Sequence, residues 1–356
     1  MKKSLLALAV LGAFAGAASA QSSVTIYGKL DQAYGKAIGT NDKAVQDTAN
    51  QSRIGFRGYE DLGGGLGALF LLEHRFAPDT GVATSASTFW QGNSYIGLKS
   101  NFGTVTIGRQ YTSSYINVRN NIDPFNGETL AALRDIGGAG GAGAGTGPGA
   151  IGQVRVQDSV KYTHTIAGFT LSADIAEADQ VSTTGATAGT ITPILGTDGN
   201  KPWSVAFSYA NGPLWAGISY EDPQGTDDNL LNLGARYKFG PVALSAGFGT
   251  GHNVNDFKVN SLLLGAVYSI GASDIKLGYA GMRVKTTAPG ADWITQNSRV
   301  GLGYHYNLSK RTKVFVDVAR DKYGAGQLNT TGQVVPTSAL ARSEKNAYDI
   351  GLQHNF

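Results

Sequence analysis

The sequence predicts an all-β protein, an antiparallel transmembrane β-barrel of sixteen strands. Segments in which apolar and polar residues alternate recur from residue 24 to the end of the chain. The connections between these segments are alternately short and long, as they are at the two ends of a membrane β-barrel. Fifty glycines, sixteen tyrosines and no cysteine fit a sheet with many tight turns and without disulfide bonds.

Residues 1–20 predict a secretory signal peptide. Two lysines precede an apolar segment over 5–14, and Ala18-Ser19-Ala20 forms a cleavage site of small residues. We therefore expect export through the inner membrane and one mature barrel domain over 21–356. Removing the two lysines lowers the formal net charge from +3 to +1. A chain so close to neutral does not favour a nucleic-acid partner.

The first predicted strand sets the pattern for the others. Val24, Ile26 and Leu30 alternate with charged or polar residues such as Lys29 and Asp31, so one face of the strand is apolar. The sixteen segments of this kind begin near residues 24, 51, 67, 90, 103, 155, 168, 202, 213, 230, 242, 258, 273, 295, 312 and 345.

Two classes of connection join these strands. Tight turns rich in Gly, Pro and Asn are predicted at 60–65, 101–102, 167–168, 211–213, 240–241, 271–272 and 307–310. Long connections are predicted at 36–50, 78–89, 111–154, 178–201, 222–229, 251–257, 284–294 and 321–344. The regular alternation predicts turns at one end of a barrel and loops at the other.

The face opposite the apolar one is rich in basic residues. It carries Lys29, Arg53, Arg57, Glu73, Arg75, Lys99, Arg155, Lys161, Arg236 and Lys238. A closed sheet with lipid outside and water inside suits both faces and leaves no unpaired strand edge in lipid. A secreted soluble β protein, whose polar faces would meet water, remains the alternative from the alternation alone.

Several motifs resemble the general-diffusion porins of Gram-negative outer membranes, in their β-proteobacterial branch. The longest, Ser52 to Leu66 (SRIGFRGYEDLGGGL), is similar to their second strand and first periplasmic turn. Further matches lie at 23–28 (SVTIYG), 95–98 (YIGL), 102–110 (FGTVTIGRQ), 308–312 (LSKRT) and 351–356 (GLQHNF).

The resemblance implies a homotrimer of sixteen-stranded barrels, each a water-filled channel for passive diffusion of small hydrophilic solutes and ions. Outer-membrane lipids and lipopolysaccharide would surround it. The barrel-assembly machinery would bind the last strand through its terminal residue, Phe356. The third outward loop, 111–154, would fold into the pore.

The family sets an acidic inserted loop against a ladder of arginines on the wall. On the wall the candidate constriction residues are Lys29, Arg53, Arg75 and Arg155, and on the loop they are Arg119, Asp123, Glu128, Arg134 and Asp135. Where the family usually has a further arginine, three residues before the YIGL motif, this chain has Gly92. We expect Arg75 to take the place of the missing arginine.

Small anions are the solutes that the inward face favours. Basic residues outnumber acids there, and charges in a confined channel act strongly on passing ions. Two alternatives remain: a substrate-specific channel, and an outer-membrane adhesin or structural barrel whose surface loops carry the function.

An enzyme is not expected. The five histidines lie on different predicted strands or at their ends, and neither HExxH nor GxSxG occurs. Without cysteine, thiolate chemistry and Cys metal sites are excluded. We expect no cofactor and no bound metal. The Gly/Ala tract at 137–149 lacks the Lys-Ser/Thr of a phosphate-binding loop and is expected to return the third loop to the wall.

Overall fold

A computed structural model describes most of the chain. The described residues are 23–38, 43–47, 52–134, 136, 151–177, 201–223, 228–252, 258–285, 293–323, 327–328, 334–335 and 343–356. The expected signal peptide, Asp135 and the tract at 137–149 lie outside them.

The described strands form one large sheet and one small one. The large sheet contains sixteen long strands: β1 (Ser23–Lys36), β3 (Ser52–Gly63), β4 (Leu66–Ala77), β6 (Ser94–Ser100), β7 (Gly103–Tyr111), β8 (Arg155–Ile166), β9 (Phe169–Ala176), β10 (Trp203–Asn211), β11 (Leu214–Asp222), β12 (Asn229–Phe239), β13 (Val242–His252), β14 (Lys258–Ile270), β15 (Ser273–Lys285), β16 (Trp293–Asn307), β17 (Thr312–Tyr323) and β20 (Ser343–Asn355). Short strands β2 (Ala44–Asp47) and β5 (Val82–Ala83) extend it, and β18 (Gln327–Leu328) pairs with β19 (Val334–Val335).

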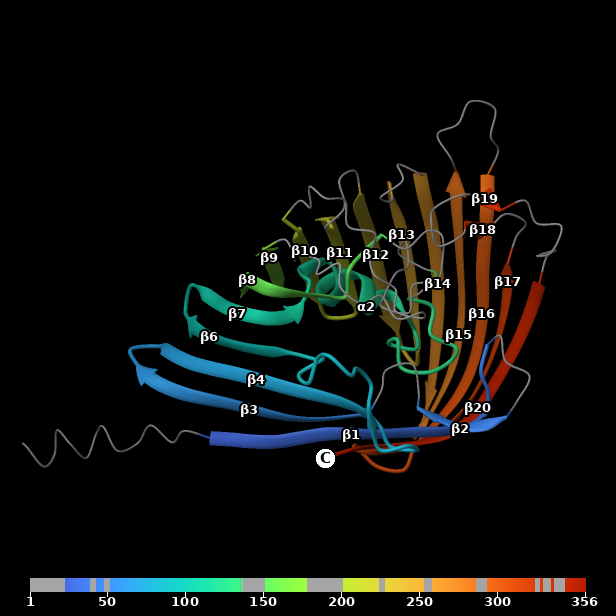
Figure 1. Cartoon of the computed structure of the whole chain (residues 1–356), viewed down its shortest axis with the longest axis horizontal. Coiled ribbons are helices and arrows are strands. Elements are labelled where there is room, and N and C mark those ends of the chain that lie inside the picture. Colours follow the sequence, from blue (N-terminus) through green and yellow to red (C-terminus); the bar gives the residue numbers. More distant parts are fainter. Residues whose placement is uncertain are drawn as a thin grey trace, which may run out of the picture.

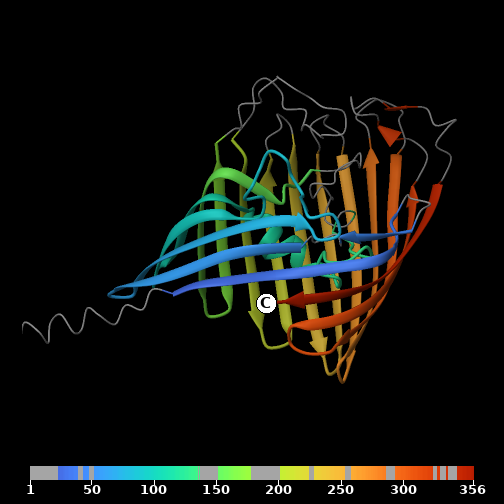
Figure 2. The same ribbon diagram turned by 60° about the horizontal axis from the view of Figure 1, so that its bottom comes forward.

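The large sheet closes on itself. Each long strand is antiparallel to its neighbours, and β20 pairs with both β17 and β1, from Lys29 opposite Asn355 to Lys36 opposite Tyr348. Figures 1 and 2 show β20 meeting β1 near the C-terminus. Closure gives each of the sixteen long strands a partner on both sides, which is what lipid requires of a sheet. The predicted sixteen-stranded antiparallel barrel is confirmed.

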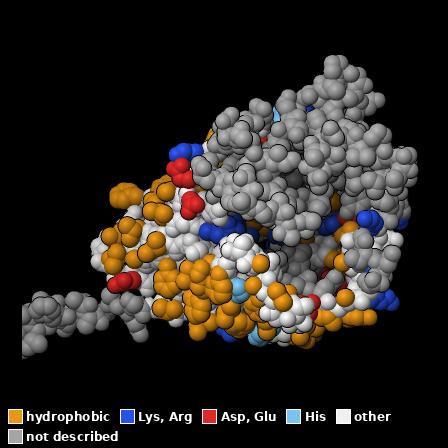
Figure 3. Space-filling view, in the orientation of Figure 1, with side chains coloured by type: hydrophobic (Ala, Val, Ile, Leu, Met, Phe, Trp, Pro, Cys, Tyr) orange, Lys and Arg blue, Asp and Glu red, His pale blue; other side chains and the backbone are white. Residues whose placement is uncertain are grey.

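Alternation along the strands separates an apolar outer face from a polar inner one. On β1, Val24, Ile26 and Leu30 are exposed on the outside, whereas Lys29 and Asp31 are buried on the inside. Figure 3 shows hydrophobic side chains gathered over β1, β3 and β4, with Lys and Arg side chains at the hollow beside them. Within the described residues, no helix is long and apolar enough to cross a membrane.

The fourth long strand, β6, begins at Ser94 and not near residue 90. Gly92 donates to the Glu73 carbonyl (3.0 Å), and Glu73 donates to the Asn93 carbonyl (2.8 Å), so this segment already lies beside β4. The preceding Phe89 and Trp90 pack edge to face with a centroid distance of 4.9 Å. These aromatic contacts take the chain out of the regular strand.

The apolar core lies inside the barrel, between its wall and the third loop. The loop contains two helical turns, η1 (Tyr115–Arg119) and α2 (Asn120–Ile122), and Figure 2 shows α2 within the curve of the strands. The core comprises Ile122, Phe125, Ala131, Ala132, Leu133, Ile136 and Ile151 of the loop with Leu230, Val259, Leu263, Ala280, Met282, Val284 and Ala319 of the wall. The predicted insertion of this loop into the pore is therefore confirmed.

Candidate functional site

Three basic residues lie side by side on the inner wall. Lys29 on β1 is the register partner of Arg53 on β3, which is in turn the partner of Arg75 on β4. Residues paired directly across antiparallel strands have Cβ atoms about 4.5–5.5 Å apart. The sheet therefore brings together positive charges that are far apart in the sequence.

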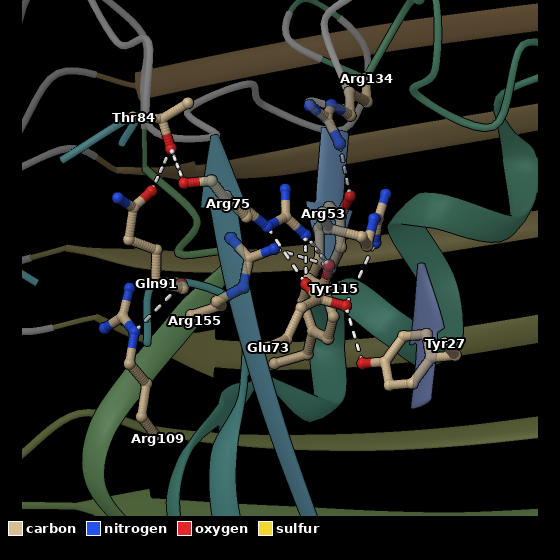
Figure 4. Close-up of polar contacts among 11 residues, drawn as sticks. Tyr27, Arg53, Glu73, Arg75, Thr84, Gln91, Arg109, Tyr115, Arg134 and Arg155 are labelled. Atoms are coloured by element: carbon tan, nitrogen blue, oxygen red, sulfur yellow. Dashed lines mark hydrogen bonds and ion pairs between the residues drawn. The ribbon is translucent and has the colours of Figure 1, made fainter. Parts of the chain in front are cut away.

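One carboxylate, that of Glu73, lies among these charges. Arg75 donates to Glu73 Oε1 from Nε (3.2 Å) and Nη2 (3.0 Å). Arg53 Nη1 (3.5 Å) and the Tyr27 hydroxyl (3.1 Å) donate to the other oxygen, Oε2. In Figure 4 these side chains converge on Glu73. Glu73 is on the same face as Arg75, two residues earlier, so the alternation of one strand positions both partners.

Arg155 joins this group from the far end of the loop. Arg155 and Tyr111 are register partners on β8 and β7, where the loop leaves and re-enters the wall. The Tyr111 hydroxyl oxygen accepts from Arg155 Nη2 (2.6 Å) and from Arg75 Nη2 (2.8 Å). The Arg155 guanidinium carbon also lies 4.2 Å from the Tyr111 ring centroid, within the range of a cation–π contact. We call Arg53, Arg75 and Arg155 the arginine cluster.

Lys29 has its own partner. Its ammonium lies 2.9 Å from Asp31 Oδ2, and both side chains are buried. The pair is neutral as a unit, so the arginine cluster and Glu73 supply most of the charge here. Three guanidiniums around one carboxylate leave an excess of positive charge.

The start of the loop is attached to the inner wall by serine hydroxyls. Ser113 Oγ lies 2.8 Å from Ser172 Oγ on β9, and Ser114 Oγ lies 2.8 Å from Ser219 Oγ on β11. The Ser113 backbone N–H donates to the Asp174 carboxylate. Small hydroxyl side chains let the two backbones approach closely while satisfying buried polar groups.

Arg119 does not face water. Its Nη1 lies 2.9 Å from Glu221 Oε1 on β11 and donates to the Gln153 carbonyl (3.2 Å). The sequence places Arg119 among the constriction residues, but the structure buries it between the loop and the wall. Its contacts hold both ends of the loop to β11.

Asp123 lies inside the loop. Its carboxylate accepts from the backbone N–H groups of Phe125 (2.9 Å), Gly127 (3.1 Å), Leu133 (2.9 Å) and Arg134 (3.2 Å). Burial raises the pKa of Asp123 above its usual range, although these hydrogen bonds act in the opposite direction. The carboxylate joins two parts of the loop and is buried away from any passing solute.

Among the expected loop residues that the structure describes, Glu128 and Arg134 stay partly exposed. Glu128 Oε2 lies 2.7 Å from Lys313 Nζ on β17. Burial alone would raise the pKa of Glu128, but the ammonium groups of Lys313, Lys29 and Lys276 lower it to about 2. Arg134 Nη1 donates to the Tyr115 hydroxyl (2.7 Å), as Figure 4 shows.

Three contributors were absent from the predicted constriction residues: Glu73, which the sequence placed only on the inward face, Tyr111 and Lys313. Glu73 and Lys313 follow from the inward alternation on β4 and β17, and Tyr111 from its place as the last residue of β7. Within the described residues, no three His, Asp or Glu side chains form a group that could hold a metal ion.

Comparison with known proteins places this arrangement in a family. A family model described as Gram-negative porin matches residues 7–326. Outer membrane porin protein 32 of Delftia acidovorans is 33% identical over 385 aligned positions covering all of both chains. An outer membrane porin protein of Bordetella pertussis is 29% identical, also over the full length of both.

The solved structure of an anion-selective porin from Comamonas acidovorans superposes with a TM-score of 0.73 at 27% identity, covering 94% of this chain and all of that one. The family match, the closed sixteen-stranded barrel and the inserted loop agree. The chain belongs to the Gram-negative porins, which are channels and not enzymes.

Proposed function

We propose that this porin is an anion-preferring diffusion channel of the bacterial outer membrane, narrowest between the arginine cluster and the third loop. The observation that carries the proposal is the sharing of one carboxylate, Glu73, by Arg53 and Arg75 with Arg155 beside them. In a water-filled barrel with low-dielectric walls, such an excess of charge raises the local concentration of counter-ions. Small anions are therefore favoured over cations of similar size.

The two described acids of the loop, Asp123 and Glu128, do little to offset this charge. Asp123 is turned into the loop's own backbone N–H groups, and Glu128 is paired with Lys313. An acidic loop facing the arginines would favour cations and anions more equally. The paired and buried acids support a passage whose charge is set by the wall.

The comparisons support the same function. The superposed porin from Comamonas acidovorans is described as anion-selective, and both full-length relatives are named as outer membrane porins. We further propose a homotrimer, export directed by residues 1–20 and solutes that are small and hydrophilic.

The test is the reversal potential of single channels in planar bilayers under a KCl gradient. We expect the wild type to prefer chloride, Arg53→Gln to reduce that preference, and Glu73→Gln to increase it. Arg236→Gln is the matched control, because Arg236 is an exposed basic residue on the inner face of β12 outside the cluster. A wild-type channel that prefers potassium, or an Arg53→Gln channel that matches the wild type, would overturn the proposal.

A further inference from the structure

Six adjacent strands place a glycine beneath the third loop. Gly217 on β11 is the register partner of Gly234, which is the partner of Gly247. A second row of glycines that are register partners, Gly265, Gly278 and Gly301, lies across β14, β15 and β16. The glycine belt, as we call it, comprises Gly217, Gly234, Gly247, Gly265, Gly278 and Gly301.

The backbone of these strands does not explain the glycines. None of the six is among the described residues with positive φ, so an ordinary L-residue would fit the local conformation. Glycine inside a strand is unfavourable because it gives up side-chain packing and conformational entropy, and it often marks the close approach of another chain segment. The reason must lie in what covers the belt.

Ile122 of α2 covers the first part of the belt. A Cβ added to Gly234 would lie 2.4 Å from Ile122 Cγ2, and one added to Gly247 would lie 2.3 Å from Ile122 Cδ1. Both distances are well below van der Waals contact, about 3.5–4.0 Å between carbons. Because the two glycines are neighbours across β12 and β13, the Ile122 side chain spans both positions.

The rest of the loop covers the second row. A Cβ on Gly265 would lie 2.4 Å from Ser245 Oγ of the wall and 2.8 Å from Pro124 Cδ of the loop, and one on Gly278 would lie 2.4 Å from Leu133 Cδ1. At Gly301 the nearest atom would be the carbonyl oxygen of Ala131, at 2.7 Å. Proline rings and backbone oxygens cannot move aside by a change of rotamer. The loop therefore lies directly on the main chain of the wall.

We propose that the glycine belt sets the width of the pore by fixing how far the third loop stands from the wall of β11 to β16. The loop lies between the belt and the arginine cluster, since it contacts the belt through Ile122, and its Glu128 interacts electrostatically with Arg53 of the cluster and with the neighbouring Lys29. Methyl groups on the belt push the loop toward the arginines by roughly 1 Å, the shortfall in contact distance. This inference rests on the proposed constriction and names the residues that control its width.

The experiment measures width and charge separately. Width is given by the single-channel conductance and by the largest neutral sugar that swells proteoliposomes, and charge by the reversal potential. Gly301→Ala and Gly247→Ala test the belt. Gly281→Ala is the matched control. Gly281 is on β15, as the belt residue Gly278 is, but it shares the outer face with Tyr279, and the nearest atom to its added Cβ is the Tyr279 hydroxyl at the end of a side chain.

A second substitution provides a rescue. Ile122→Val removes the Cδ1 atom that a Cβ at Gly247 would meet. We expect Gly301→Ala and Gly247→Ala to lower the conductance and the sugar size limit, Gly281→Ala to leave both unchanged, and Ile122→Val to restore them in the Gly247→Ala background. If Gly301→Ala fails to fold, the comparison of Gly247→Ala with the double variant Gly247→Ala/Ile122→Val still tests the belt.

Wild-type conductance and sugar limit in a folded belt variant would overturn the inference, as would a fall that Ile122→Val does not reverse. Neutral sugars are insensitive to the charge of the arginine cluster. A failure of the proposed anion preference would therefore appear in the reversal potential alone and is distinguishable from a failure of the belt.

Discussion

Arg119 of the third loop and Glu221 of β11 form an ion pair with an N···O distance of 2.9 Å and side chains that are only 1% and 2% exposed. The two residues are 102 positions apart in the sequence. Removing two charges from water is costly, and their attraction repays this cost only with good geometry and further hydrogen bonds. The Gln153 carbonyl supplies one such bond to Arg119. The pair thus fixes one position of the loop against the wall.

Replacing one residue of this pair should destabilise the protein more than replacing both. Glu221→Leu leaves the Arg119 guanidinium buried without its carboxylate, and we expect it to lower the free energy of unfolding by about 3–5 kcal/mol. The double variant Arg119→Leu/Glu221→Leu should recover most of the loss, because neither charge remains. Urea unfolding of the folded protein in detergent micelles measures both. Equal stability of the single variant and the wild type would contradict a role for the pair in holding the loop.

The link between Glu128 and Lys313 should survive moderate acid. The pKa of Glu128 is about 2 in the folded protein, below its ordinary value of 4.5. A depressed carboxyl pKa means that the link stabilises the fold fully above about pH 4.5 and is lost as the pH falls through about 2. We expect the part of the wild-type conductance that depends on this link to change only below about pH 3.

Glu128→Gln is the control for this pH dependence. This variant lacks the titrating carboxyl. At neutral pH its conductance should already resemble that of the wild type without the link, and it should change less than the wild type as the pH falls. Other acids of the barrel titrate in both proteins, so the difference between the two profiles isolates Glu128. Parallel profiles would show that the Lys313 link does not position the loop.

The barrel could be predicted because lipid and water impose one constraint on every strand. A shift of a strand by one residue would turn each of its side chains to the opposite face, so segments such as Val24 to Asp31 alternate strictly. For this reason the predicted first residues of most segments lie close to those of the observed long strands. The short strands β2, β5, β18 and β19 carry no such constraint. They lie within the long connections, where β2 pairs with β1, β5 with β4 and β18 with β19, and no alternation of apolar and polar residues indicated them.

The candidate site was predictable only where it belongs to strands. Lys29, Arg53 and Arg75 face inward by alternation, and the sheet register brings them together. Arg119 and Asp123 could not be placed in this way, because their partners are Glu221 on a distant strand and the loop's own N–H groups. One signal was present: both faces of β14 are apolar over 262–264, which indicates that something covers its inner face.

The seam of the barrel should depend on Gly28 and Phe356. The two exchange backbone hydrogen bonds of 3.0 Å in both directions, and a Cβ on Gly28 would lie 2.2 Å from Phe356 Cζ. Gly28→Ala should therefore displace the terminal ring. Phe356→Ala should cost about 1–2 kcal/mol, less than the 3–5 kcal/mol of a fully buried Phe, because the side chain is 43% exposed.

Refolding into micelles, followed as the fraction of barrel formed with time, measures both seam variants. We expect slower and less complete folding for each, since the pairing of β20 with β1 closes the sheet. Leu277→Ala is the control: it removes an apolar residue, 51% exposed, from the outer face of β15, which pairs with β14 and β16 and not with the seam strands. If Leu277→Ala impairs folding as much as Phe356→Ala, loss of apolar surface and not the seam is responsible.

Arg75 should carry the charge that the family places at the position of Gly92. A Cβ on Gly92 would lie 2.1 Å from Glu73 Oε1, so the Glu73 carboxylate bound to Arg75 leaves no room for a side chain there. Arg75→Gln should reduce anion preference in a KCl gradient and leave Tyr111 with Arg155 as its remaining guanidinium donor. In the Arg75→Gln background Glu73 Oε1, the atom that a Cβ at Gly92 would meet, loses both hydrogen bonds from Arg75, while Oε2 keeps its contacts with Arg53 and Tyr27. Glu73 can then shift more easily, and Gly92→Arg should restore part of the preference. Gly92→Arg alone should lower the yield of folded barrel, because Glu73 remains held by Arg75. A double variant no more selective than Arg75→Gln would show that the two positions are not interchangeable.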